Sequence, residues 1–497
     1  MTTSIYNRRP ALLFLLVVAL LVSISAVLGV AILFESSSYA YARLAYGLLA
    51  AAALLFVLWQ VIRHGWIGLL TPLSMTMFGF IYFFCFVPVL NPSLIPDLYS
   101  TPERFLPLAT WVGVGMLSFV VGYNSPKPNL RWLARWLGTP LDLRKLLRLT
   151  FLVMAVYIFL AIIIALLEGV PLGALILEST YSQVKEFGLS PYEGSSYYQY
   201  QIFRWLPIAL APLVTLCLLE AKISIFQRLI LLAGLLLSIL FSFGSGVRYI
   251  FSYVVGGIAC PLALLRGEVW RQSKGRMVIT VAILAIGFIL TTVQISVRSD
   301  IGLYSLLTGR VKFSLRELLT IPASELAADQ NYSLEGVLNA LNNGWIKPLW
   351  GETYLLNFVM FIPRAIWPSK PGARTAEALA MANPFEGSNV SYSAIGELAF
   401  NFTLWGVPPG MWLSGWLAGL WWRFFSKNRT NVRMAVIYGM SVVPFIFIVR
   451  GSFATMFGAI MYPTLLVILI LRLAGKSEVL KYAKRLSRPN CSYNRCS

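Results

Sequence analysis

Apolar residues gather along this chain in long, unbroken runs rather than in an alternating pattern. A helix needs about 20 mostly apolar residues to cross the hydrocarbon core of a bilayer. Because backbone groups find no water there, spans must be helices or closed barrels, and barrel strands would alternate apolar with polar positions. The pattern therefore predicts an all-α, polytopic integral membrane protein with about 12 transmembrane helices. The predicted spans are 11–34, 44–62, 69–90, 105–123, 149–167, 205–219, 229–243, 249–265, 277–297, 403–424, 434–449 and 454–472.

The spans divide the chain into a long N-terminal bundle, one large outer loop, a short C-terminal bundle and a tail. Within the outer loop, the pattern predicts a helix with Ser333 as its N-cap. It also predicts a short interfacial helix at 393–402, because a further span there would place the basic residues after it on the outer side. The four regions are 1–297 with about nine spans, the periplasmic loop 298–402, 403–475 with about three spans, and the basic cytoplasmic tail 476–497.

Composition and charge agree with a membrane location. Of the 497 residues, 58% are hydrophobic and only 12% are charged, against about 25% charged in soluble domains. The net charge of +20 would suggest a nucleic-acid partner in a soluble protein. Here the cytoplasmic segments hold 26 of the 40 basic residues and 4 of the 20 acidic residues, as the positive-inside rule expects. Membrane orientation explains the excess charge, so no nucleic-acid partner is expected.

The residues that usually bind metals are scarce on the predicted outer side. The single histidine, His64, lies on the cytoplasmic side, and the four aspartates form no D-x-D pair. Metal-dependent glycosyl transfer would need paired carboxylates for a hard divalent cation. The sequence therefore predicts no metal site and no cofactor.

Several cations lie at the outer face, against the positive-inside trend. Arg248 and Arg450 follow predicted spans at their outer ends, and the outer loop adds Arg364, Lys370 and Arg374. Arginine binds phosphate through two parallel hydrogen bonds, and ionisable residues at membrane depth are candidates for function. These residues predict an anion site for a lipid diphosphate. The alternative is that Arg248 and Arg450 extend to the phosphates of outer-leaflet lipids.

Three stretches carry a resemblance to a known family. They are Phe361-Ile-Pro-Arg-Ala-Ile-Trp-Pro-Ser-Lys-Pro371, Ile395-Gly-Glu-Leu-Ala-Phe-Asn-Phe-Thr-Leu-Trp-Gly406 with the glycine-rich span after it, and Phe243-Gly-Ser-Gly-Val-Arg248. The chain resembles the Wzy-type O-antigen or oligosaccharide repeat-unit polymerases. The last stretch is similar to their glycine-serine-arginine motif, although Val247 intervenes here. The resemblance implies a GT-C-like glycosyltransferase of the bacterial inner membrane.

The resemblance also implies a reaction. Such an enzyme joins undecaprenyl-diphosphate-linked oligosaccharide repeat units at the periplasmic face and releases undecaprenyl diphosphate, without a metal. Its partners are these lipid-linked sugars, membrane lipids, and a chain-length regulator and flippase of the same pathway. We expect Arg248, Arg364 and Arg450 on the diphosphate with Lys370 and Arg374 beside them, Glu397 or else Glu352 as general base, and Tyr249 and Tyr392 against the sugars.

Three other functions fit parts of the same pattern. A flippase or transporter of lipid-linked oligosaccharide would act on the same substrate, although transporters often show inverted repeats, which this sequence lacks. An O-antigen ligase would use the same donor, but members of that family rely on an outer histidine. The third possibility is a structural protein of an envelope complex.

Overall fold

The computed structural model describes residues 39–90, 92, 96–128, 141–168, 196–244, 248–264, 282–283, 286–287, 330–345, 347–359, 367, 393–451 and 453–475. In this part of the chain the regular structure is helical, and its one β-bridge joins Leu141 to Gly475. The all-helical class predicted from the apolar runs is therefore correct for the described residues.

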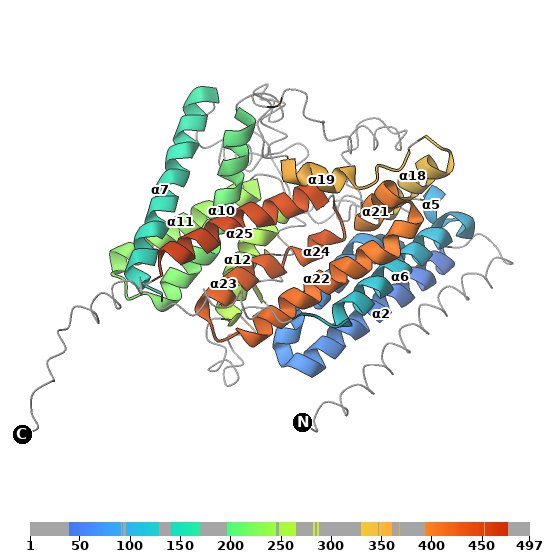
Figure 1. Ribbon diagram of the computed structural model, residues 1–497, viewed down its shortest axis with the longest axis horizontal. Helices are drawn as coiled ribbons and strands as arrows, with labels where there is room; N and C mark the ends of the chain where they lie inside the picture. Colours follow the sequence, from blue (N-terminus) through green and yellow to red (C-terminus); the bar gives the residue numbers. More distant parts are fainter. Residues whose placement is uncertain are drawn as a thin grey trace, which may run out of the picture.

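The helices follow one another along the chain and pack into one layered body (Figure 1). Helices α2, α6 and α22 lie at one side, α7 and α11 lie at the other, and α10, α12, α23 and α25 lie between them. In the N-terminal part the elements are α2 (Ala40–His64), η2 (Gly65–Leu70), α3 (Pro72–Phe80), the π-helix η3 (Ile81–Cys85), α4 (Phe86–Leu90), α5 (Pro96–Tyr99), α6 (Pro102–Asn124), α7 (Leu143–Glu168), α10 (Ser196–Glu220), α11 (Ile225–Gly244) and α12 (Arg248–Leu264). They continue with α18 (Gln330–Asn342), α19 (Glu352–Val359), α21 (Ala394–Phe402), η6 (Leu404–Gly406), α22 (Val407–Lys427), α23 (Val432–Val442), α24 (Phe445–Ile448) and α25 (Phe453–Leu473).

Five of these helical segments are long and apolar enough to cross a membrane. They are Ala40–Leu70, Pro72–Leu90, Pro102–Asn124, Leu143–Leu166 and Ile225–Phe243. Shorter apolar helices cover Trp205–Glu220, Ile250–Leu264, Val432–Ile448 and Ile460–Leu473. Ten predicted spans coincide with helices, whereas 11–34 and most of 277–297 lie outside the described residues. In its described part the protein is thus helical, with helices of the length and composition of membrane spans, and the total of 12 spans stays a prediction.

Helices α3 and α23 each begin at a polar side-chain cap. The Thr71 hydroxyl accepts the backbone N–H of Ser74 at 3.1 Å, and Pro72 fills the first position of α3. The Asn431 side chain accepts the N–H groups of Arg433 and Met434 at the start of α23. Such caps satisfy backbone donors that have no partner within the helix. They therefore fix where α3 and α23 start.

Helices α6 and α22 run parallel and approach at their backbones. A Cβ atom added to Gly415 would meet the Phe119 carbonyl, and one added to Gly122 would meet the Trp412 carbonyl. Gly415 and Gly419 are spaced four residues apart, the spacing with which small residues let membrane helices pack closely. This pair forms one edge of the body, against which α18 and α21 pack.

Contacts between distant segments fall at two opposite ends of the helices. At one end, the rings of His64 and Trp422 lie 5.0 Å apart, and Arg423 donates to the Lys127 carbonyl at 2.8 Å. At the other end, Arg104 pairs with Glu335 at 2.7 Å. With the N-terminus on the cytoplasmic side and the 12 predicted spans alternating in direction, each pair joins two segments on the same side of the membrane. We call these the inner end and the outer end.

Helix α18 of the predicted outer loop is fastened to the outer end. The Asn331 amide donates to the carbonyl of Phe84 at 2.7 Å and to the hydroxyl of Tyr99 at 3.0 Å, and it accepts from Tyr46 at 2.9 Å. Ser333 was predicted as the N-cap, but the helix begins at Gln330. That prediction was wrong because these buried bonds hold the preceding turn in place.

The short helix predicted at 393–402 is present as α21, which ends where Thr403 takes a positive φ of 60°. The sequence suggested that it lies at the membrane interface. Instead, its residues from Ile395 to Asn401 are all buried within the protein. An apolar run of this length packs equally well against lipid or against other helices, so the sequence alone did not separate the two.

Candidate outer-face anion site

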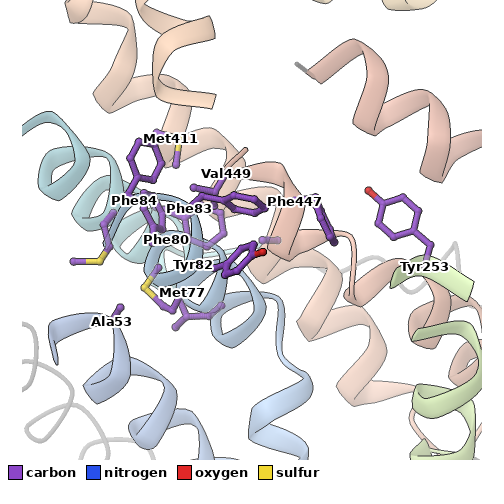
Figure 2. Packing of buried hydrophobic residues seen from close by; sticks show 14 of the residues in the cluster. Ala53, Met77, Phe80, Tyr82, Phe83, Phe84, Tyr253, Met411, Phe447 and Val449 are labelled. Atoms are coloured by element: carbon purple, nitrogen blue, oxygen red, sulfur yellow. The ribbon is translucent and has the colours of Figure 1, made fainter. Parts of the chain in front are cut away.

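The candidate site lies at the outer end, where α24 closes on the π-helix. The Phe447 ring lies 5.8 Å from Phe83 and 5.8 Å from Tyr253, and Figure 2 shows it between them. Gly79 allows this approach, since a Cβ atom there would meet the Ile446 carbonyl. The three rings belong to η3, α24 and α12. They form an apolar floor that joins segments far apart in the sequence.

Arg450 lies at the edge of this floor. Its backbone N–H bonds to the Phe447 carbonyl at 3.0 Å, and its guanidinium carbon lies 6.0 Å from the centre of the Phe83 ring. A guanidinium over an aromatic face gains a favourable interaction that does not neutralise its charge. Arg450 is half-buried. The floor therefore positions a cation at the outer end while part of it stays accessible.

Helix α21 starts beside Arg450. Its Ala394 N–H bonds to the Val449 carbonyl at 3.0 Å, and the Ser393 hydroxyl caps the helix by accepting from Gly396 at 2.9 Å. Glu397 belongs to the first turn of this helix. Of the predicted site residues, the structure thus brings Glu397 and Arg450 to the same end of the body.

The Glu397 side chain takes part in a buried hydrogen-bond network. Its carboxylate accepts from the Thr353 hydroxyl at 2.9 Å. The Asn401 amide donates to that hydroxyl at 2.7 Å and to the Glu397 backbone carbonyl at 2.8 Å. Glu397, Thr353 and Asn401 are all buried. The network ties α19 to α21.

The burial of the Glu397 carboxylate limits its access to a substrate proton, which matters for its predicted role as general base. A base must reach the proton that it removes, although catalytic contacts often form only with substrate bound. In this arrangement the carboxylate faces Thr353, so it positions α19 against α21. Burial and the Glu397 charge raise the pKa of the neighbouring Tyr354 hydroxyl, which keeps that group protonated. The role as base stays a prediction, as does that of Glu352, the first residue of α19.

Arg248 is the first residue of α12. Tyr253, five residues further on, contacts Phe447, so the N-terminus of α12 lies toward the same end as Arg450. The structure describes only the backbone of Arg248 and Tyr249. The remaining predicted site residues lie outside the described part of the chain: Arg364, Lys370, Arg374 and Tyr392.

Helices α21 and α25 both begin close to Arg450, and α12 begins toward the same end. Helix α12 begins at Arg248, α21 begins beside Val449, and α25 begins at Phe453. The helix dipole gives an N-terminus a partial positive charge that favours anions. At α21 the Ala394 and Gly396 N–H groups are already bonded to the Val449 carbonyl and the Ser393 hydroxyl, so this helix contributes its dipole. Sequence reasoning missed this feature, because it follows from the long-range pairing of Ala394 with Val449. Together with Arg450, the arrangement can bind a negatively charged group.

Thr353 and Asn401 were also missed. No spacing or motif distinguishes them in the sequence, since the hydrogen bonds of Thr353 to Glu397 and Asn401 span more than 40 positions. Among the described residues, no group of three or more His, Cys, Asp or Glu side chains could hold a metal ion. Comparison of the chain with protein families, characterised proteins and solved structures finds no match.

Proposed function

We propose that this protein is a lipid-linked polysaccharide polymerase of the Wzy type in the bacterial inner membrane. The observation that carries the proposal is Arg450, held over the Phe83 ring at one end of a membrane helix body, with α25 beginning three residues later and α12 beginning toward the same end. That end is the one the basic residues predict to face outward. A diphosphate carried on a membrane lipid is an anion that such an end would meet.

In the proposed reaction, the terminal hydroxyl of a lipid-linked repeat unit attacks the anomeric carbon of the growing chain. The bond from that carbon to the diphosphate oxygen breaks, and undecaprenyl diphosphate leaves with the electron pair. Negative charge develops on the leaving group, where preorganised cations stabilise the transition state. Arg450 and Arg248 supply two of these cations, and Arg364, Lys370 and Arg374 of the outer loop supply others.

The remaining residues serve the acceptor. The attacking hydroxyl loses its proton to a carboxylate, Glu397 or Glu352, or to solvent. Tyr249 and Tyr392 stack on the sugars. No metal takes part in this scheme, since charge stabilisation by arginine and lysine replaces it.

Reconstitution tests this proposal. The purified protein in liposomes, given undecaprenyl-diphosphate-linked repeat units without ATP and with EDTA, is expected to form a ladder of polymers and to release undecaprenyl diphosphate. Gel electrophoresis and thin-layer chromatography measure the two products. Movement of the substrate across the bilayer without chain growth would indicate a flippase, and transfer to a lipid A core alone would indicate a ligase. A ladder that appears only with added Mg²⁺ would overturn the metal-independent reaction.

A further inference from the structure

Two tryptophans are strongly exposed at the outer end. Trp405 is 85% exposed and Trp350 is 75% exposed. Phe402 lies against Gly351 and Gly406, the chain neighbours of the two tryptophans. Its ring stacks on Tyr354 with ring centres 6.2 Å apart. A Cβ atom at Gly351, next to Trp350, would lie 3.2 Å from the Phe402 ring. We call Trp350, Phe402 and Trp405 the aromatic rim.

Backbone geometry directs the rim outward. Trp350 has a φ of 48°, Gly351 of 91° and Thr403 of 60°. A bulky residue in this left-handed region costs on the order of 1–3 kcal/mol unless its surroundings hold it there. Here the Trp350 N–H bonds to the Asn401 carbonyl at 2.8 Å, and the Gly351 N–H bonds to the Asn401 side chain at 3.1 Å. The chain thus sustains a costly turn that presents an indole ring to the surroundings.

The rim continues an apolar face of α22. Beyond Trp405, the exposed apolar side chains of that helix are Pro409, Trp412, Leu413 and Leu417, and its exposed polar side chains are Arg423, Ser426 and Lys427. Its 21 residues span about 31 Å at 1.5 Å per residue, which is close to the thickness of a hydrocarbon core. Aromatic residues near the start of the helix, leucines further along and basic residues at the inner end are the profile of a lipid-facing membrane helix.

We propose that the aromatic rim anchors the outer elements in the lipid head-group boundary of the outer leaflet. The lipid surface is its partner, because the rim joins the exposed face of α22 without a break. Trp350 is bonded to the helix that carries Glu397, so the anchor fixes the depth of α21 and of Arg450 beside it. The cations of the candidate site then lie at the level of lipid phosphates. This anchoring role does not depend on the proposed polymerase activity.

Spin labelling measures this depth directly. Trp350→Cys and Trp405→Cys would carry a nitroxide in a chain whose Cys491 and Cys496 are replaced by serine, since Cys85, Cys217 and Cys260 are buried. In liposomes, collision with oxygen reports contact with lipid, and collision with a nickel chelate reports contact with water. Leu417→Cys provides the lipid control and the exposed Asn343→Cys provides the water control.

Both rim labels are expected to collide readily with oxygen and at least fivefold less with the nickel chelate than the label at position 343. Nickel collisions equal to those at 343 would overturn the anchor and indicate a water-facing surface, such as a sugar platform. Low collision with both agents would overturn it in favour of a protein partner. If a cysteine variant does not fold, brominated lipids provide the test. Bromines near the head group should quench the wild type more than Trp405→Phe, and equal quenching would contradict the anchor.

Discussion

Replacing Arg450 by alanine is expected to abolish chain growth while the protein level stays normal. The same is expected of Arg248→Ala, at the start of α12. Each variant loses a charge-assisted bond to the leaving diphosphate of roughly 1.5–3 kcal/mol, which corresponds to a fall in rate on the order of 10- to 100-fold or more. Polymer yield per folded protein in the reconstituted reaction measures the effect.

Arg423→Ala provides the matched control, because Arg423 is an exposed arginine at the inner end. It should leave chain growth nearly unchanged. Lysine at position 450 should restore activity only in part, since it cannot form two parallel bonds to phosphate. If both arginines merely extend to lipid phosphates, lysine would substitute fully and alanine would lower protein level more than specific activity. Full activity of Arg450→Lys and Arg248→Lys would remove the diphosphate role.

Gly415→Ala is expected to lower the melting temperature of the protein by several degrees. The added Cβ atom meets the Phe119 carbonyl, and because backbone cannot turn aside, α6 and α22 must separate. Overpacking of this kind costs on the order of 1–3 kcal/mol. Size-exclusion chromatography after heating in detergent measures the loss of folded protein.

Gly47→Ala in α2 is the control for this second prediction. No atom lies within 4 Å of a Cβ atom at Gly47. In a helix, alanine is more favourable than glycine by about 1 kcal/mol, so this variant should be neutral or more stable. The same glycine-to-alanine change is therefore expected to lower the melting temperature at position 415 and to leave it unchanged or raise it at position 47. Equal stabilisation by both would contradict the close α6–α22 contact.

The positions of the helices could be predicted from the sequence because a long apolar run has few other solutions in a membrane. Local details within the outer loop could not. Ser333 looks like an N-cap, yet Asn331 bonds to Phe84 and Tyr99 and so extends α18 by a turn. Those bonds join residues more than 200 positions apart, which no local pattern reports.

For the candidate site too, the sequence indicated some features and the fold alone revealed others. Arg450 and Glu397 could be singled out by their charge within apolar surroundings. Their proximity depends on the bond from Ala394 to Val449, which only the folded chain reveals. The burial of Glu397 behind Thr353 likewise has no sequence signal, because threonine and glutamate are common in exposed loops. Residue type therefore identified candidates, and tertiary packing decided what they contact.

The most direct measurement for the central claim is the structure of the protein in a lipid nanodisc with undecaprenyl diphosphate, determined by cryo-electron microscopy. The account predicts density for the diphosphate within hydrogen-bonding distance of the Arg450 and Arg248 side chains, at the depth of Trp405. A diphosphate bound instead at the inner end beside Lys127 and Arg423, or no bound diphosphate at saturating ligand, would contradict it.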